Sequence, residues 1–313
     1  MDGIIGIDKP AGLTSFDIVA RLRNATGERR IGHTGTLDPD ATGVLVICIG
    51  SATRISSRLM HGTKRYSAEI CFGTSTDTAD ASGEMLDSSP YMSIASSSFA
   101  AALSGFIGEI VQKPPMYSAV KVGGKKLYEL ARHGLTVDRP GREVTISELK
   151  ASLPEGKDRI LFGDRVPLEI ECSHGTYIRT LCEDIGRSLG VPSHMSSLRR
   201  TWSSGWAEED CLGLEQALEL ARKGELQPRL RDISSALPWM QAIALDKAEL
   251  KLVCNGGSIA AYSLEGATEV LLVGPGGRAA AIAEVHRLPS NAPDKSILKP
   301  KTVFIKPEET ANA

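Results

Sequence analysis

The chain has 313 residues with a hydrophobic fraction of 42% and a charged fraction of 24%, values typical of a globular protein with room for about two domains. The formal net charge of −2 does not by itself favour a nucleic-acid partner. No apolar run approaches the ~20 residues of a membrane helix, and the first residues lack the basic start and long apolar core of a signal peptide, so we expect neither a membrane span nor secretion.

Six cysteines are scattered along the chain, and none of them forms a Cys-x-x-Cys pair. This spacing argues against a zinc site, and together with the missing signal peptide it favours reduced cysteines packed in a protein core. We therefore expect no bound metal and a cytoplasmic location.

The first two elements are expected to be a strand and a helix. Residues 3–8 are largely apolar and predict a short strand that ends at Lys9. Thr14 or Ser15 is a typical residue before a helix. The apolar residues that follow at helical spacing are Phe16, Val19 and Leu22.

Residues 31–43 have an unusual composition, with three glycines, a proline, a histidine and two aspartates. The glycines allow backbone angles that other residues avoid, and Pro39 pushes Asp38 toward an extended conformation, so Asp38 is expected on an irregular loop. The apolar residues 44–49 predict a buried strand directly after it. A carboxylate on a loop beside a core strand is common at catalytic sites, although an ordinary Asp-Pro turn is the alternative.

The loop sequence Gly-His-Thr-Gly-Thr-Leu-Asp-Pro at residues 32–39 closely resembles the catalytic motif of the TruB family of tRNA pseudouridine synthases. In that family the aspartate of this motif is catalytic. The resemblance therefore implies that Asp38 is the catalytic carboxylate.

Residues 52–60 predict a second helix, and residues 63–72 partly alternate between polar and apolar, which predicts a strand. At the start of that strand Lys64, Arg65 and Tyr66 place an aromatic ring beside two cations. This arrangement favours a contact with a nucleotide, although Tyr66 could equally be a packing residue.

The following part of the chain is expected to be mostly irregular. Residues 73–83 predict a loop, whose Asp77 and Asp80 lack the spacing of a full EF-hand calcium loop. The serine-rich residues 88–98 predict an exposed connection, which leads to a helix at residues 99–106.

Residues 112–142 predict an inserted basic segment. Two prolines break regular structure near its start, two adjacent glycines mark a tight turn, and residues 127–132 predict a short helix. From residue 121 to residue 142 its cations are Lys121, Lys125, Lys126, Arg132, Arg139 and Arg142. The sequence Met-Tyr-Ser-Ala-Val-Lys at residues 116–121 resembles a second TruB motif, which implies a segment that closes over tRNA. A solvated basic surface is the alternative.

Two further motifs lie beyond this segment. Residues 166–172 predict a strand that leads into a helix, and the sequence Gly-Thr-Tyr-Ile-Arg at residues 175–179 matches a TruB motif at their junction. Tyr177 and Arg179 belong to this motif. Residues 196–200 resemble the Leu-Arg-Arg segment that lines the uridine pocket in the family.

The C-terminal part matches the family more weakly. Residues 214–223 predict a surface helix and residues 231–238 a linker. Residues 239–307 contain short strands, Gly-rich turns and a basic run, and resemble a small β-barrel of the PUA type. The resemblance is specific over about residues 3–206 and only architectural after them.

We therefore expect an α+β fold in which a mixed, largely antiparallel sheet with flanking helices precedes a small β-barrel. The resemblance implies the pseudouridine synthase fold for residues 1–235, including the inserted segment, and a PUA-like RNA-binding domain for residues 239–307.

The resemblance further implies catalytic roles for Asp38, Tyr66 and Arg179. A carboxylate in a dry pocket tends to take up a proton, and an adjacent arginine prevents this, so Arg179 would keep Asp38 ionised. The ring of Tyr66 would stack on a flipped uridine and its phenol would move a proton in a later step.

Five more residues are implied to bind the substrate. Tyr177 would shape the pocket and Leu198 would give it an apolar wall, while His33 would occupy the space that the flipped base leaves. Lys9 would frame the pocket, and Asp80 would brace Arg179. No cofactor is expected, because the reaction breaks and re-forms a bond between base and sugar without oxidation.

The implied function is an isomerase that converts the T-loop uridine of tRNA, position 55, to pseudouridine. The implied partners are the T-loop and acceptor arm of tRNA, and we expect a monomer without an obligate protein partner. One alternative is a ribosomal RNA pseudouridine synthase of a guide-RNA complex, although those relatives generally lack the inserted basic segment. Another is a tRNA-folding chaperone without chemistry, which would not need the catalytic residues.

Overall fold

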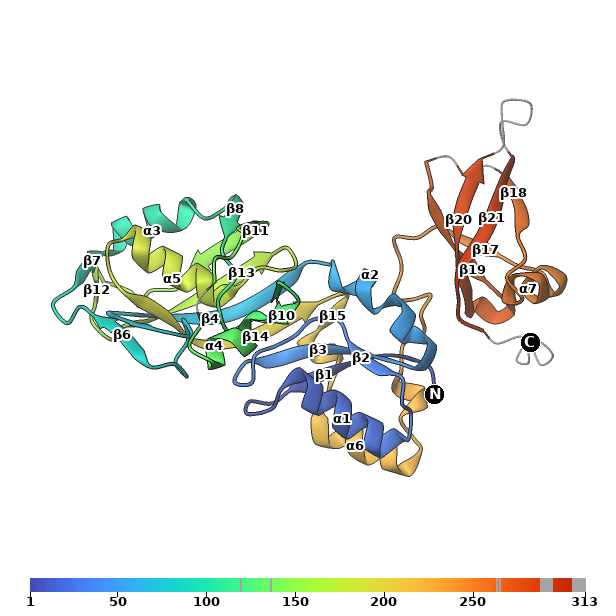
Figure 1. Cartoon of the computed structure of the whole chain (residues 1–313), viewed down its shortest axis with the longest axis horizontal. Coiled ribbons are helices and arrows are strands. Elements are labelled where there is room, and N and C mark those ends of the chain that lie inside the picture. Colours follow the sequence, from blue (N-terminus) through green and yellow to red (C-terminus); the bar gives the residue numbers. More distant parts are fainter. Residues whose placement is uncertain (119, 136, 263, 265, 288–294, 306–313) are drawn as a thin grey trace.

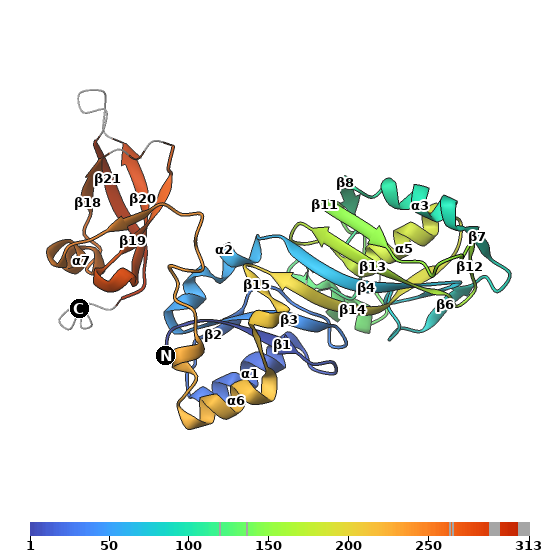
Figure 2. The ribbon, with the colours of Figure 1, turned by 180° about the vertical axis from the view of Figure 1, so that it is seen from behind.

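The structure, a computed structural model, describes residues 1–118, 120–135, 137–262, 264, 266–287 and 295–305. Figures 1 and 2 show a large body formed by most of the chain and a smaller body formed by the C-terminal part, joined by an irregular segment.

A ten-stranded sheet forms the centre of the large body. Its neighbouring strands are antiparallel except for two parallel pairs, β1 with β16 and β3 with β14. In sheet order the strands are β16 (Cys211–Gly213), β1 (Gly3–Lys9), β3 (Thr42–Ile49), β14 (Ser193–Ser203), β4 (Lys64–Phe72), β13 (Arg165–Cys172), β11 (Arg142–Ala151) and β8 (Gly108–Gln112), with β2 (Ile31–His33) beside β3 and β15 (Trp206–Ala207) beside β14. The predicted mixed, largely antiparallel sheet is confirmed.

Helices cover the sheet in two groups. Helix α1 packs against α6 and α3 packs against α5, and the two pairs lie toward different ends of the sheet (Figure 1). The helices are α1 (Ser15–Thr26), α2 (Ser56–Met60), α3 (Ser96–Ser104), α4 (Leu127–Arg132), α5 (Ile178–Ser188), α6 (Leu214–Lys223) and α7 (Lys247–Cys254), and the 3₁₀ turns are η1 (Gly50–Ile55), η2 (Glu208–Asp210), η3 (Gln227–Arg229) and η4 (Pro275–Gly277).

Helix α1 illustrates how local sequence sets its bounds. The Thr14 side chain accepts a hydrogen bond from the Asp17 amide while the Asp17 carboxylate accepts one from Thr14, which satisfies amides at the helix start. Gly27 ends the helix in the left-handed conformation, with φ of 72°. The buried side chains are Ser15, Ile18, Val19 and Leu22. Phe16 belongs to the same helix but is 62% exposed, because it lies off this face.

Two regions predicted as irregular contain strands. Within residues 73–83, β5 (Thr74–Thr76) forms a hairpin with β6 (Met85–Ser88). Within residues 88–98, β7 (Ser93–Ala95) pairs with the distant β12 (Arg159–Leu161). The second pairing depends on a partner far along the chain, so local composition could not predict it.

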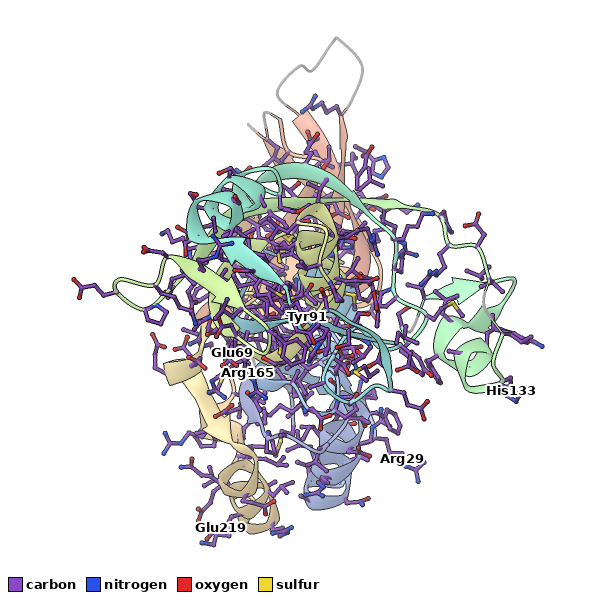
Figure 3. All side chains as sticks on the ribbon, turned by 90° about the vertical axis from the view of Figure 1, so that its left-hand side faces the viewer. Arg29, Glu69, Tyr91, His133, Arg165 and Glu219 are labelled. Carbon is purple, nitrogen blue, oxygen red and sulfur yellow. The ribbon has the colours of Figure 1, made fainter. Side chains whose placement is uncertain are left out.

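The inserted segment has the predicted hairpin and helix. Strands β9 (Lys121–Val122) and β10 (Lys125–Lys126) pair around the two glycines, and α4 follows them. Figure 3 shows this segment, identified by His133, standing out from one side of the sheet. The side chains of Lys121, Lys126 and Arg132 lie outside the described part of the chain.

The smaller body contains a curled five-stranded sheet. In sheet order its strands are β17 (Ala242–Ala244), β19 (Glu269–Val273), β20 (Ala279–Arg287), β21 (Lys295–Val303) and β18 (Ile259–Tyr262). The predicted small β-unit is confirmed, and its described strands form a half-barrel that leaves β17 and β18 as edges. Residues 306–307, where the predicted basic run and domain end, lie outside the described part.

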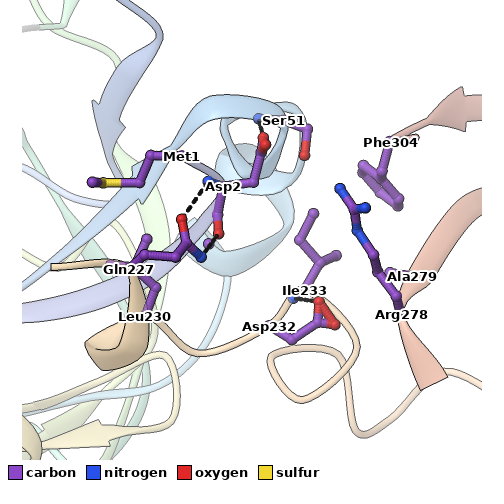
Figure 4. Close-up of a pocket in the computed structure, with 11 residues that line it drawn as sticks. Met1, Asp2, Ser51, Gln227, Leu230, Asp232, Ile233, Arg278, Ala279 and Phe304 are labelled. Carbon is purple, nitrogen blue, oxygen red and sulfur yellow. Dashed lines mark hydrogen bonds between the residues drawn. The ribbon is translucent and has the colours of Figure 1, made fainter. Parts of the chain in front are cut away.

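The expected linker at residues 231–238 is partly buried where the two bodies meet. Its Ile233 and Leu237 belong to a hydrophobic cluster that also includes β3 and η1 of the large body and Ile282 and Phe304 of the small one. A cavity of about 390 Å³ lies beside this cluster (Figure 4). The segment therefore forms part of a shared core rather than a free tether.

Candidate active site

A cleft of about 340 Å³ brings the motifs of the sequence analysis together in one place. Its lining comes from the loop between β2 and β3, from strands β4 and β14, from the start of α5, and from Ser118 and Arg142 of the inserted segment. These segments are far apart in the sequence, and the sheet order brings them together because β3, β14 and β4 are neighbours.

Asp38 and Arg179 form a two-point ion pair in this cleft. Arg179 Nε lies 3.0 Å from Asp38 Oδ2, and Arg179 Nη2 donates a hydrogen bond of 3.2 Å to Asp38 Oδ1. The Arg179 side chain is only 5% exposed, whereas that of Asp38 remains 37% exposed. The guanidinium is thus buried behind a carboxylate that faces the cleft, which is the arrangement that orients a reactive carboxylate.

The other donors of Arg179 fix its position. Arg179 Nη1 lies 3.5 Å from Asp80 Oδ2 and donates to the Thr78 carbonyl at 3.1 Å, and Nη2 donates to the Tyr117 carbonyl at 2.8 Å. Asp80 in turn accepts hydrogen bonds from Thr78 Oγ1 and Ser82 Oγ at 2.7 and 2.6 Å. Arg179 therefore has a second carboxylate behind it and cannot swing away from Asp38 without breaking several bonds.

The electrostatic environment of Asp38 opposes its ionisation on balance. Burial raises the pKa of Asp38, the positive charge of Arg179 lowers it, and the negative charge of Asp80 raises it again. Arg179 is thus needed to keep the carboxylate ionised in a site that disfavours negative charge.

Lys9, which is fully buried, binds the loop that carries Asp38 from the protein interior. Lys9 Nζ donates to the carbonyls of Pro10, Leu13 and Pro39 at 2.9, 2.6 and 2.8 Å. Burial lowers the pKa of Lys9 to about 8. Because Pro39 directly follows Asp38, Lys9 supports the loop that carries Asp38 rather than lining the cleft.

Tyr66 on β4 and Arg200 on β14 lie opposite each other on neighbouring strands. The register of β4 and β14 pairs Tyr66 with Arg200, and both residues are buried and line the cleft. Arg200 Nε donates to the Val44 carbonyl at 2.7 Å and Nη2 to the Gly35 carbonyl at 3.0 Å. Burial raises the pKa of Tyr66, and the charge of Arg200 and a hydrogen bond with it oppose this rise.

Tyr177 stands at the start of α5 and is fixed by a glutamine from β8. Its amide donates to Gln112 Oε1 at 3.0 Å, and Gln112 Nε2 donates to its carbonyl at 3.3 Å. Leu198 on β14 lines the cleft as an apolar side chain. The Ser118 hydroxyl, in a residue only 5% exposed, has no hydrogen-bond partner among the described residues.

The structure therefore brings most of the predicted site residues together. Those that line the cleft are Asp38, Tyr66, Tyr177, Arg179 and Leu198. Asp80 contacts Arg179 from behind, and Lys9 lies beneath the loop. His33, whose Nδ1 accepts a hydrogen bond of 3.3 Å from the Gly35 amide, is not among the lining residues.

Sequence reasoning assigned no individual role to Arg200 or Gln112. Arg200 lies in the segment that resembles Leu-Arg-Arg, and the two-residue period of a strand would have placed it on the same face as Leu198. Gln112 gave no such signal, because its role depends on a pairing with the start of α5, which lies far along the chain.

Neither a metal site nor a membrane span emerges from the described residues. They contain no group of three or more His, Cys, Asp or Glu side chains placed to hold a metal ion. No helix of the described part is long and apolar enough to cross a membrane. The six cysteines are all free thiols in the structure.

Comparison with known proteins gives a consistent family. The N-terminal domain model of TruB family pseudouridylate synthases matches residues 23–178, and the C-terminal domain model of tRNA pseudouridylate synthase B matches residues 179–237. A Bacillus anthracis protein named tRNA pseudouridine synthase B is 44% identical over 82% of this chain and 83% of its own length. A protein of the same name from Geobacillus thermodenitrificans is 41% identical over 97% of this chain and 100% of its own length.

Among solved structures, a Cbf5–Nop10–Gar1 complex contains a chain with a TM-score of 0.71, at 23% identity, covering 98% of this chain and 86% of that one. A second, from a box H/ACA ribonucleoprotein bound to a substrate RNA, has a TM-score of 0.71 at 21% identity, covering 98% of this chain and 86% of that one. At these identities the likeness concerns the fold.

Proposed function

This chain belongs to the TruB family of pseudouridylate synthases, and from that premise we infer that it isomerises the T-loop uridine of tRNA, position 55, with Asp38 as the catalytic carboxylate. The observation that supports the site assignment is the two-point pair between Asp38 and the buried Arg179 in the cleft. The enzyme is an isomerase, and the relatives at 41–44% identity carry the same activity in their names.

The reaction separates uracil from the ribose, turns the base and joins it again through C5. We assign to Asp38 the attack on the flipped nucleotide, because an ionised carboxylate at the mouth of a cleft is a competent nucleophile. Arg179 would keep the Asp38 carboxylate ionised and oriented toward the cleft. Losing one partner of such a buried pair costs about 3–5 kcal/mol in other proteins, so Arg179→Ala should severely reduce the rate.

The target uridine must leave the folded loop of the RNA to reach Asp38, and flipping costs a few kcal/mol. Stacking on an aromatic ring returns about 1–3 kcal/mol per base, and the cleft offers Tyr66 and Tyr177 for this. Leu198 would pack on the base as an apolar wall. The phenolate form of Tyr66 would also receive the proton that leaves C5, and His33 would occupy the space that the base vacates.

We propose a division of RNA contacts between the two bodies. Residues 1–235 would hold the T-loop, with the inserted segment 112–142 closing over it, and residues 239–307 would contact the acceptor arm. Exposed cations of the inserted segment, including Lys125 and Arg142, support this assignment because phosphates dominate affinity for RNA. The protein would act in the cytoplasm as a monomer.

The two alternative functions have less support. The chains from the Cbf5–Nop10–Gar1 and archaeal box H/ACA Nop10–Cbf5 complexes resemble this chain in fold at 20–23% identity, whereas the named tRNA enzymes reach 41–44% over most of the chain. A chaperone without chemistry would have no use for the Asp38–Arg179 pair.

A tRNA transcript labelled with tritium at C5 of uridine tests the proposal directly. Tritium enters water only when the new bond forms at C5. We expect release with the wild type and none with Asp38→Asn, while both proteins bind the transcript with similar affinity. Binding without release by the wild type would refute the proposed chemistry, and undiminished release by Asp38→Asn would refute the assignment of Asp38.

A further inference from the structure

Arg200 is a buried cation that has no carboxylate partner in the described part of the chain. It is 1% exposed, and it donates hydrogen bonds to the carbonyls of Val44 and Gly35. Among the described residues, no Asp or Glu lies within ion-pair distance of its guanidinium, in contrast to Arg179. Burial of an arginine without a counter-charge costs free energy. A negative charge that forms in the cleft during the reaction would offset this cost.

The neighbouring Arg199 shows that arginines of β14 can have carboxylate partners. Arg199 faces the other side of β14, where its guanidinium lies 3.1 Å from Asp8 and also pairs with Glu208. Successive residues of a strand point to opposite faces, so adjacent arginines occupy different environments. Arg199 therefore has carboxylate partners at the sheet surface, whereas Arg200 has none among the residues that the structure describes.

Tyr66 lies directly opposite Arg200 in the sheet register. The charged and titratable groups that act on its phenol are Arg200 from β14, Cys172 from β13 and Asp38 from the loop. Arg200 is the only one of the three that favours the ionised phenol. Lys64, on the same face of β4, donates to the carbonyls of Met60 and Gly62 and adds a second buried cation to this side of the cleft.

We propose that Arg200 is a positioning residue for Tyr66, whose guanidinium holds the phenol in place and stabilises its phenolate form during proton transfer from C5 of the substrate. The inference rests on the proposed function. In this step the C5–H bond breaks, its electron pair restores the C5–C6 double bond of the base, and the proton passes to the Tyr66 oxygen and then to water. N1 of the turned base takes a proton from water, so no proton is gained or lost overall.

A purely structural role is the competing explanation, because Arg200 also ties β14 to the segment that carries Asp38. The two roles differ in what they predict for Tyr66. If Arg200 only holds the backbone, its loss should slow the reaction in the same proportion whatever residue stands at position 66. If it acts through the phenol, its effect should depend on the acidity of that phenol.

The test measures single-turnover tritium release against pH for the wild type, Arg200→Met, Arg200→Lys and the opposite-face control Arg199→Met. We expect Arg200→Met to lose about tenfold or more in rate and to shift the pH dependence of the rate toward higher pH. Each unit of pKa corresponds to about a tenfold change in the ionised fraction of Tyr66. Arg200→Lys should recover part of the loss, and Arg199→Met should keep the wild-type profile. An unshifted profile in Arg200→Met would overturn the proposal.

Replacing Tyr66 with 3-fluorotyrosine, whose phenol is more acidic, supplies an independent readout. It should rescue Arg200→Met several-fold while changing the wild type little, and a Tyr66→Phe background should make Arg200→Met nearly silent. Equal effects in all backgrounds would favour the structural role. Should Arg200→Met fail to fold, Arg200→Lys in the same backgrounds decides the question.

Failure of the proposed function would be recognised separately, because the wild type itself would release no tritium. In that event the absorbance of the Tyr66 phenolate, measured against pH without RNA, still tests the interaction between Arg200 and Tyr66. Subtracting the titration of Tyr66→Phe isolates Tyr66, and the proposal expects its midpoint to rise in Arg200→Met and not in Arg199→Met. An unchanged midpoint would contradict it.

Discussion

Asp38 shows how a single buried carboxyl group can make the stability of the protein depend on pH. Its pKa is raised by burial even though Arg179 stands beside it, so the folded protein binds the proton of this carboxyl more tightly than the unfolded chain does. Its contribution to stability is therefore fully present below the ordinary pKa of 3.8 and is lost as pH rises through the raised value. At neutral pH the charged form of Asp38 lowers the stability of the fold, and the proposed mechanism uses that form.

We predict from this that Asp38→Asn abolishes tritium release without lowering the melting temperature at neutral pH. The amide has no charge to bury, and Arg179 keeps Asp80 and two carbonyls as partners. The difference in stability between variant and wild type should shrink as pH falls toward 3.8. Calorimetry over this pH range checks it, and a variant clearly less stable than wild type at pH 7 would contradict it.

Lys9 gives the opposite sign of pH dependence. Burial lowers its pKa from 10.5 to about 8, so its contribution to stability is present above the unfolded value and is lost as pH falls through the folded one. We predict that the free energy of unfolding of Lys9→Met, which lacks the buried charge, compares most favourably with that of the wild type at neutral pH. That relative stability should decline between pH 8 and 10.5.

The same variant should reduce the rate of catalysis at every pH, because three carbonyls lose their donor and the loop after Asp38 loses its support. Urea titrations at several pH values and single-turnover rates measure the two effects on one protein. If the stability difference between Lys9→Met and wild type stayed flat across this range, the pKa of Lys9 would have to be near its ordinary value.

At the scale of elements, β14 holds the cleft together because it pairs with both β3 and β4. The crossing of β14 and β3 requires Gly43, whose φ is +96° and whose added Cβ would collide with the backbone carbonyl of Arg200. Any shift of β14 there also moves Arg200 against Tyr66. The β3–β14 crossing therefore sets the geometry of two cleft side chains, those of Arg200 and Tyr66.

We predict that Gly43→Ala lowers both stability and activity. A side chain at positive φ costs about 1–3 kcal/mol, and the collision adds to that. Gly27→Ala is the matched control, since Gly27 also has a positive φ of +72° but has nothing within 4 Å of its added Cβ. Chemical denaturation and tritium release compare the two, and equal losses in both variants would mean that the β3–β14 crossing tolerates a side chain.

The elements also show which parts of the structure the sequence could predict. Helices α4 and α6 were predicted with their observed bounds, because their apolar spacing and terminal glycines lie within the segment itself. Asp38 and Arg179 could be named because they stand in motifs. The pairing of β7 with β12 and the register of Arg200 with Tyr66 depend on segments far apart in the chain, which local patterns do not contain.

At the scale of the whole molecule, the two bodies are joined by apolar packing as well as by charge. Phe304 and Ile282 of the small body share a cluster with Val44 and Ile55 of the large one, and Phe304 is only 6% exposed. Arg58 makes a two-point pair with Glu269 across the same joint, at 2.5 and 2.9 Å. Because both partners of this pair are partly exposed, the apolar packing should dominate the coupling.

We therefore predict that the wild type unfolds in one calorimetric transition and that Phe304→Ala separates the melting of the small body from that of the large one. Removal of a buried phenylalanine costs about 3–5 kcal/mol, whereas an exposed ion pair contributes about 0–1 kcal/mol. Glu269→Gln is the control that removes the ion pair alone, and it should keep a single transition. Two transitions in the wild type would show that the cluster does not couple the bodies, and one transition in Phe304→Ala would show that other contacts across the joint suffice.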